Sequence, residues 1–339
     1  MLKLLQSIFR QTAVTGKNYD DNLLELAIDR VVDGTDTRLK AVSGYRKRLQ
    51  ASVVTALDYT IELVDDLPPP ISLSPQRFGK DDYVRSFFVS PDDISEFFTH
   101  CRALQRYLET HSGLDPEYLF ALLVLTRMER EVFGMKMEGE ILRRDIAQTA
   151  VSFTQHRLSS IKDEESKSRF EMKKNVFDYF VELALKDIIS IKEESRKASQ
   201  QRDLLSRKLR TLESVNWGME SLLAGKTEKL VDDGRTQQEL VQLEAEFQRL
   251  SVAPLTLDHY LDSIANSLND VRARLWKEPL LLKLDRLGIK SDQVSSAITL
   301  ELNEYCSADG GRIIALPIQI PFDSVPLQPD LLGDVERYL

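Results

Sequence analysis

The segment FDYFVELALKDIISIKEESRKASQQRDLLSRKLRTLESVNWGMESLL, which runs from Phe177 to Leu223, decides the expected fold class. Apolar residues recur along it at alternating spacings of four and three, which is the heptad pattern of helices that supercoil around a partner. Eleven of the fourteen heptad core positions are apolar, and no proline occurs between Phe177 and Ala253. The segment therefore predicts a coiled coil.

A turn and a shorter returning helix are expected after this long helix. Asp232-Asp233-Gly234 has the composition of a turn. The apolar residues that follow keep spacings of three and four, and they are Leu240, Leu243, Phe247 and Leu250. Residues 161–253 thus predict an antiparallel coiled-coil hairpin. The returning helix is too short to cover the seam from Phe177 to Ala198, so that part needs cover from the N-terminal helices or from a second chain.

Residues 1–160 are expected to form an N-terminal helical bundle. Asp36 is placed to cap a helix that reaches about Leu67, and three consecutive prolines then open an irregular linker at 68–90. Ser90-Pro91-Asp92-Asp93 combines a capping hydroxyl, a first-turn proline and carboxylates beside the positive helix end. Asp115-Pro116-Glu117 has the same character, so we expect mostly helix from there to about residue 160.

The apolar spacing changes to two after Pro279, which indicates strands. Three strands are expected between residues 280 and 320, the last two joined by a hairpin loop at Cys306–Gly311. Pro317 predicts that the last strand lies at a sheet edge. Residues 254–325 are therefore expected to form a small α+β domain, followed by an acidic tail at 326–339. The expected fold class is mainly α, with a helical bundle, a long antiparallel coiled-coil hairpin and a small C-terminal α+β cap of three short strands.

Composition excludes some classes of protein. The chain of 339 residues has a formal net charge of −9 and a pI near 5.2, which argues against a surface that binds nucleic acid throughout. Cys101 and Cys306 form no paired framework, which is typical of a reducing compartment. The longest uncharged apolar run, Tyr118 to Thr126, is about half of the roughly 20 residues that a membrane-spanning helix needs. We expect a cytoplasmic protein, with a peripheral membrane location as an alternative.

Motifs for catalysis or cofactor binding are not found. Gly225-Lys226-Thr227 resembles the end of a phosphate-binding loop, but Glu220 stands where that motif requires glycine. None of the four histidines has a partner at metal-ligand spacing, and adjacent His100 and Cys101 would point about 100° apart on a helix. The sequence therefore predicts no catalytic residue, no cofactor and no metal. An enzyme whose site is dispersed along the chain would leave no such local signature.

Three features could bind a partner. The first is a group of basic residues at outer positions of the coiled coil, where a solvated face is the favoured interpretation over an anionic partner; it comprises Arg196, Lys197, Arg207, Lys208 and Arg210. The second is an amphipathic N-terminal segment, residues 2–13, whose apolar face could dock on the bundle or on a membrane; that face holds Leu2, Leu5, Ile8 and Phe9. The third is the edge of the C-terminal sheet, which could accept a partner strand.

The function expected from these features is non-catalytic interaction or scaffolding inside the cell. The coiled coil would supply reach and the α+β cap would supply recognition, so a protein partner or self-association is expected. One alternative is a peripheral membrane protein tethered by residues 2–13. Another is a nucleic-acid-associated protein that binds through residues 196–210, with binding that weakens steeply as salt rises. No small-molecule substrate can be identified from the sequence.

Overall fold

The computed structural model describes residues 19, 21–111, 113, 115–138, 141–223, 241–242, 256–290 and 297–326, with the side chains of 135–144 and 209–223 left out. Two compact units can be distinguished. The first contains the described residues of Met1–Leu24, Val54–Tyr179 and Asn269–Leu339, and the second contains those of Glu25–Val53 and Phe180–Leu268.

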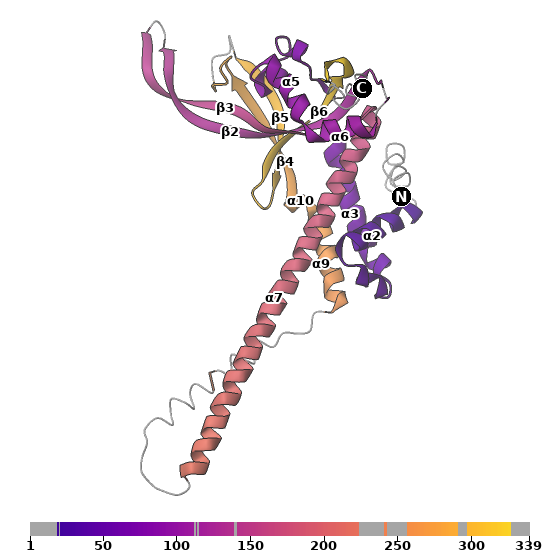
Figure 1. Cartoon of the computed structure of the whole chain (residues 1–339), viewed down its shortest axis with the longest axis vertical. Coiled ribbons are helices and arrows are strands. Elements are labelled where there is room, and N and C mark those ends of the chain that lie inside the picture. Colours follow the sequence, from indigo (N-terminus) through magenta and orange to yellow (C-terminus); the bar gives the residue numbers. More distant parts are fainter. Residues whose placement is uncertain are drawn as a thin grey trace, which may run out of the picture. The chain divides into compact units, whose positions relative to one another are not determined.

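Runs of helices and runs of strands follow one another along the chain, and Figure 1 labels most of these elements. The helices are α2 (Asp21–Thr35), the 3-10 helix η1 (Thr37–Ala41), α3 (Tyr45–Asp65), the 3-10 helix η2 (Pro75–Arg77), α4 (Asp82–Phe87), α5 (Pro91–His100), α6 (Arg102–Thr110), α7 (Glu165–Leu223), α9 (Leu257–Asn269), α10 (Val271–Arg274) and the 3-10 helix η3 (Phe322–Ser324). The strands are β1 (Ile71–Ser72), β2 (Tyr118–Glu138), β3 (Ile141–Lys162), β4 (Leu275–Leu284), β5 (Ile298–Ser307) and β6 (Arg312–Pro321).

The first unit is built on a six-stranded sheet in the order β3-β2-β6-β5-β4, with β1 paired to β6. All neighbouring strands are antiparallel except β1, which runs parallel to β6. β5 pairs with β6 only where residues 304–306 face residues 312–314. Beyond that point the two strands diverge, and the Tyr83 hydroxyl donates to the carbonyl oxygen of Glu301 at 3.3 Å. A helix side chain thus occupies a position that a neighbouring strand would otherwise take.

The sheet curls so that the turn following one edge strand, β4, reaches the other edge strand, β3. The turn after β4 forms backbone hydrogen bonds with β3, from Val151 N to Gly288 O at 2.8 Å and from Lys290 N to Thr149 O at 2.9 Å. Gly288 has a φ of +76°, and a Cβ atom there would lie 2.9 Å from the Val151 carbonyl oxygen. Only glycine combines this left-handed backbone with such a close approach.

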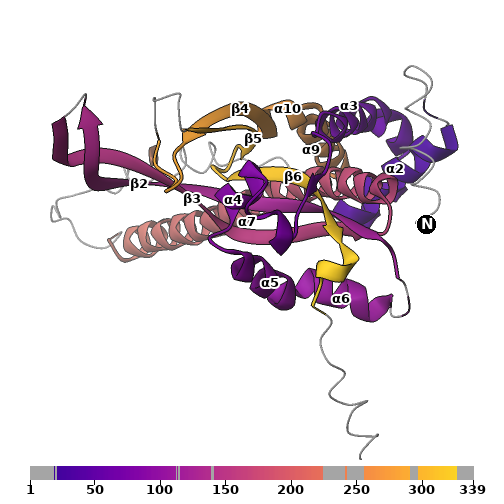
Figure 2. The same ribbon diagram turned by 90° about the horizontal axis from the view of Figure 1, so that it is seen from above.

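One apolar core fills the inner face of the curled sheet. Alternate residues of β2 are buried in it, because successive side chains of a strand point to opposite faces; they are Leu119, Ala121, Leu123 and Leu125. Figure 2 shows α5 and α6 beside one face of the sheet, and their buried side chains, including Ile94, Phe98 and Leu104, join the same core. The sheet is therefore the organising element of this unit.

The expected fold class is wrong. Instead of a mainly α chain with a helical bundle over residues 1–160 and a small three-stranded cap, the structure contains a large six-stranded sheet. Its two longest strands, β2 of 21 residues and β3 of 22, occupy a region that we expected to be helical. The physical reason is tertiary: β2 pairs with β6 from the C-terminal part of the chain, and a local reading of sequence cannot see that partner.

The three strands expected after Pro279 are present as β4, β5 and β6, and a hairpin joins the last two. They form no separate cap, since β6 lies between β2 and β5. The expectation that Pro317 marks an edge strand is wrong for the same reason. Pro317 instead falls between the last residue of β6 paired with β5, Ile314, and the first paired with β1, Ile318. A residue without an N–H is tolerated there because that side of β6 has no ladder partner at this point.

The expected helix starts are partly confirmed. Ser90 caps α5, with its hydroxyl accepting a hydrogen bond from Asp93 N, and Pro91 occupies the first turn. Asp36 is also a cap, but of the short helix η1, and α3 begins only at Tyr45. Gly44, with a φ of +71°, separates the two. The single helix expected from Asp36 to Leu67 is therefore interrupted.

In the second unit the apolar seam of α7 is buried at Val181, Ala184 and Ile188. A Cβ atom on Gly34 of α2 would lie 2.6 Å from a methyl carbon of Val181, so α2 packs directly against this seam. The N-terminal helices thus supply one of the two covers that were expected for it. The turn at Asp232–Gly234 and the returning apolar residues Leu240, Leu243, Phe247 and Leu250 lie outside the described residues.

Among the helices in the described chain, none combines the length and the apolar character that crossing a lipid bilayer requires.

Candidate protein-interaction site

The hairpin of β2 and β3 continues past the rest of the sheet. β2 pairs with β6 as far as Leu125, which faces Ile314. Residues 126–138 then pair only with residues 141–154 of β3 in the described structure. We call these two segments the β2–β3 arm, and Figure 1 shows them curving away from β4, β5 and β6. An isolated two-stranded ribbon is only marginally stable in water, so the arm depends on what holds its base.

Several side chains on the β2 strand of the arm are exposed, unlike those at the start of β2, whereas Val151 and Phe153 of β3 are buried where the arm meets the core. Phe133 is 77% exposed and Met128 is 36% exposed. The charged side chains between them, Glu129, Arg130 and Glu131, are also exposed. A large aromatic side chain in water contributes nothing to folding, and exposed aromatic groups are enriched among residues that bind partners.

Three bulges twist β3 but leave β2 regular. At each register shift one residue of β2 faces two of β3. The extra residues include Asp145, Gln155 and Ser160, whose φ values are 58°, 55° and 56°. This left-handed conformation is normally adopted by glycine and costs other residues roughly 1–2 kcal/mol. Bulges of this kind increase the local twist and turn the arm away from the core.

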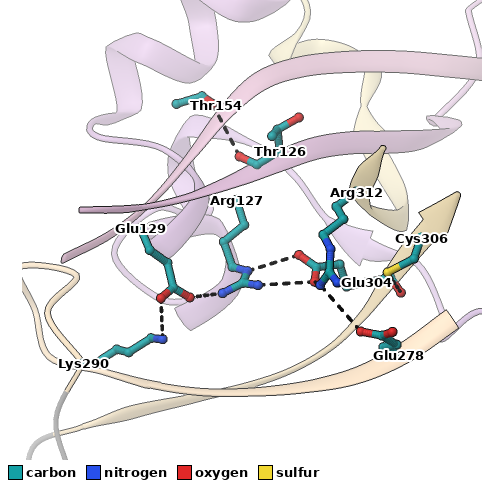
Figure 3. Close-up of polar contacts among 9 residues, drawn as sticks. All are labelled: Thr126, Arg127, Glu129, Thr154, Glu278, Lys290, Glu304, Cys306 and Arg312. Atoms are coloured by element: carbon teal, nitrogen blue, oxygen red, sulfur yellow. Dashed lines mark hydrogen bonds and ion pairs between the residues drawn. The ribbon is translucent and has the colours of Figure 1, made fainter. Parts of the chain in front are cut away.

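A buried ion pair anchors the base of the arm (Figure 3). Glu304 of β5 is only 5% exposed although its carboxylate is charged. Arg127, at the start of the arm, donates to its two oxygens from Nε at 3.2 Å and from Nη2 at 3.3 Å. The two bonds are parallel, as in a bidentate arginine–carboxylate pair, and they satisfy both buried oxygens.

Further charges extend this pair in both directions. Arg312 Nη1 lies 3.1 Å from Glu304 and 3.6 Å from Glu278, which are directly opposite each other on β5 and β4. Two carboxylates at opposed positions would repel, and the shared guanidinium relieves that repulsion. On the other side Arg127 also pairs with Glu129, and Glu129 pairs with Lys290 at 2.7 Å.

The result is a row of six alternating charges, which we call the charge ladder; its members are Lys290, Glu129, Arg127, Glu304, Arg312 and Glu278. It connects the arm, the β5–β6 hairpin, β4 and the turn after β4, and its charges cancel. The ladder therefore links the base of the arm to three other parts of the sheet.

The chemistry of the ladder does not match a metal centre. Within the described chain, one group of three side chains could offer ligands, namely Glu278, Glu304 and Cys306, with donor atoms within 4.8 Å of one another. Arg127 and Arg312 already occupy the oxygens of Glu304. Burial, followed by the nearby Glu278, raises the pKa of the Cys306 thiol, which therefore stays protonated near neutral pH.

His156 lies where the arm joins the core. Its Nε2 is 2.8 Å from the Phe87 carbonyl oxygen, so this nitrogen carries the donated proton. The imidazole stacks on Phe88 at a centroid distance of 4.6 Å and meets the edge of Phe97 at 5.8 Å. Burial lowers the pKa of His156 below 6.5, opposed by the hydrogen bond to Phe87 and by the charge of Asp93. The histidine ties the α4–α5 connection to β3 in its neutral form.

The basic residues predicted as an anionic-partner site lie on α7 and away from the arm in sequence. Arg196, Lys197, Arg207 and Lys208 are exposed, and the side chain of Arg210 lies outside the description. Acidic Glu193, Glu194 and Asp203 are exposed among them. The apolar N-terminal face of Leu2, Leu5, Ile8 and Phe9 also lies outside the described residues.

Sequence reasoning missed the arm and its ladder. The run Tyr118–Thr126 contains a signal for the core half of β2 alone, because a short apolar run that is too brief for a membrane helix also suits a strand covered on both faces. Arg127 and Glu304 are 177 positions apart, and no local pattern connects them.

Comparison of the chain with protein-family models gives no match, and comparisons with curated proteins and with solved structures give no significant match. The assignment of the candidate site therefore rests on the geometry of this structure.

Proposed function

We propose that this chain is a non-catalytic interaction protein whose binding element is the β2–β3 arm, and that its partner is another protein. The observation that carries the proposal is the exposed Phe133, on a two-stranded ribbon that continues past the core and is anchored by a buried ion pair. Preorganisation lowers the entropic cost of binding, and a fixed arm presents its aromatic group at a defined position.

The opposite edge of the sheet is less suited to a partner. β4 is the edge strand there, and it carries Pro279 together with exposed Lys277 and Lys283. Proline and lysine on an edge strand are features that prevent pairing with other chains. The sequence analysis expected the edge of the C-terminal sheet to bind a partner. We propose that the arm binds the partner instead.

Affinity capture with a matched pair of variants tests the proposal. Tagged wild type, Phe133→Asp and Val89→Asp would be used to capture proteins from cells of the source organism, and each captured protein would then be purified and its affinity measured by calorimetry. Val89 is 89% exposed on the α4–α5 connection, so Val89→Asp introduces the same charge outside the arm.

We expect Phe133→Asp to weaken binding at least about tenfold, as truncation of an aromatic hot spot does, and Val89→Asp to leave it unchanged. Circular dichroism would establish that both variants fold. A partner that binds wild type and Phe133→Asp with equal affinity would contradict the proposal.

A further inference from the structure

The bulge at Gln155 and His156 lies where the arm begins. The register of β2 and β3 leaves these two residues opposite the single residue Leu125. Leu125 is also the last residue of β2 that pairs with β6. Because a bulge adds twist to its strand, this one influences the direction in which the arm leaves the sheet.

The bulge is strained, and side-chain contacts hold it. Gln155 has a φ of 55°, a conformation that is costly for a residue with a Cβ atom and persists only where neighbouring groups fix it. Thr126 Oγ1 donates to Gln155 Oε1 at 3.1 Å in an exposed contact, for which water competes. His156 makes the more protected contact, since its imidazole donates to the Phe87 carbonyl oxygen and stacks on Phe88. The histidine therefore joins the bulge to the helical layer.

We propose that His156 is a pH-sensitive switch for the arm. In its neutral form the histidine holds the bulge and fixes the arm. In its protonated form it leaves its contact with the α4–α5 connection, and the arm becomes mobile. Nε2 already carries the proton that is donated to the Phe87 carbonyl oxygen, so the added proton binds to Nδ1. The imidazolium then places a full charge between Phe88 and the edge of Phe97, where apolar rings replace water.

The surroundings of the imidazole favour its neutral form. Uncharged groups meet or face it from α4, the α4–α5 connection, α5 and β2; they are the Phe87 carbonyl oxygen, Phe88, Phe97 and Leu125. Asp93 of α5 is charged and attracts a proton to His156, but its carboxylate also accepts a hydrogen bond from Val89 N at 3.0 Å. Arg157, the next residue of β3, is exposed to solvent. Burial outweighs the hydrogen bond to Phe87 and the attraction of Asp93, so the pKa of His156 lies below 6.5 and a falling pH favours the released ring.

The switch would regulate the partner binding proposed above, and to that extent it rests on the proposed function. A fixed arm presents the exposed Phe133 at a defined position, whereas a mobile arm must be ordered when the partner binds. Partner affinity should therefore fall as the pH falls. The movement of the arm itself needs no partner, so it can be measured on the chain alone.

Nitroxide labels on the full chain test the switch by electron paramagnetic resonance. One protein carries the label through Glu131→Cys, at an exposed position of the arm, and a second carries it through Lys283→Cys, at an exposed position of β4. Both proteins also carry Cys101→Ser, because Cys101 is partly exposed, whereas Cys306 is buried. The line shape gives the ratio of mobile to immobile label between about pH 7.5 and about pH 5.5. Far-UV circular dichroism establishes that the chain stays folded over this range.

The arm label should respond to pH and the β4 label should not. The ratio of mobile to immobile label at position 131 should begin to rise below about pH 6.5, by at most about tenfold per pH unit, which is the limit for one proton. His156→Gln should remove this response, because the glutamine amide does not titrate. The matched control is His111→Gln, which replaces an exposed histidine and should keep the response.

A response at position 131 that survives in His156→Gln would overturn the inference, and so would an arm label whose mobility is independent of pH in the protein that retains His156. An equal response at position 283 would also overturn it, since the whole sheet would then loosen. Arm mobility is measured without a partner, so a failed capture experiment leaves this inference intact. Conversely, an arm that does not respond to pH leaves the proposed function intact.

Discussion

The two halves of β2 follow different physical rules although they form one continuous strand. From Tyr118 to Leu125 alternate side chains are fully buried, and the strand has a neighbour on each side. From Thr126 onward it has one neighbour, and as far as Gly134 its side chains are partly or fully exposed. The change occurs where β6 stops pairing, at Leu125 facing Ile314. The first half is specified by burial, and the second half by the ion pairs and bulges at its base.

This contrast separates folding from binding within a single element. Residues of the first half contribute to the free energy of unfolding, whereas exposed residues of the second half contribute little to it and remain available to a partner. Substitutions matched across the junction at Leu125 therefore measure how complete the separation is.

The largest expected effect comes from the buried half. Leu123 is 1% exposed within the core, and Leu123→Ala should lower the free energy of unfolding by about 2–5 kcal/mol, because the cavity cannot collapse fully. Met128→Ala, the matched change in the arm, should alter it by less than about 1 kcal/mol. Urea denaturation followed by circular dichroism measures both. Equal losses would show that the arm is part of the core and would remove the distinction between the halves.

Breaking the anchor should have the next largest effect. Glu304→Gln removes a buried charge from between Arg127 and Arg312, and we expect a loss of about 1–3 kcal/mol, since the guanidinium of Arg127 is then left poorly satisfied. Glu131→Gln is the same chemical change at an exposed position and should be nearly neutral. Urea denaturation compares the two, and hydrogen exchange should show faster exchange along the arm only in Glu304→Gln. A neutral Glu304→Gln would mean that the ladder does not hold the arm.

A smaller, pH-dependent effect is expected at the junction, from His156. Because burial holds its folded pKa below 6.5, the unfolded chain binds more protons between the folded value and 6.5. The contribution of neutral His156 to the free energy of unfolding is therefore fully present above about pH 6.5, and it is lost as the pH falls toward the folded pKa. For one proton, the free energy of unfolding changes by at most about 1.4 kcal/mol per pH unit.

Comparison with His156→Gln isolates this contribution. The amide of glutamine can still donate to the Phe87 carbonyl oxygen, but it does not titrate. Denaturation of both proteins between about pH 7.5 and about pH 5.5, roughly one unit on each side of the reference pKa, should give a steeper loss of stability in wild type. Parallel curves would exclude a role for the histidine.

Local patterns predicted the C-terminal strands and the start of α5 because each depends on neighbours in sequence. The β5–β6 hairpin has alternating apolar residues and a glycine-containing loop, and Ser90 meets its hydrogen-bond partner Asp93 three positions later. β2 depends on a distant partner instead. Asp115-Pro116-Glu117 satisfies the rule for a helix start, but the residues that follow form β2 because they pair with β6.

The charge ladder could not be predicted for a related reason. In the sequence, Arg127 and Glu129 are two charges within a charged stretch, and the burial that distinguishes Glu304 is a property of the folded sheet. The exposure of Phe133 on a strand could not be predicted either, because an aromatic residue between charged ones suits a half-buried helix as well as a strand.

The smallest expected effect concerns the bulge at Asp145, and it tests whether the geometry of the arm is set by its own backbone. Asp145 is exposed and has a φ of 58°, so Asp145→Gly should make the arm slightly more stable and Asp145→Val less stable, with a difference of about 1–2 kcal/mol between them. Ala147 faces Phe133 in regular pairing two residues later, where a valine suits a strand and a glycine weakens it. The order of stability should therefore reverse, with glycine favoured at position 145 and valine favoured at position 147. The hydrogen-exchange rates of the arm amides measure the stability of the arm itself, even if the arm opens without unfolding the core. The same order at both positions would show that no left-handed bulge forms at Asp145, and the direction of the arm would then require another cause.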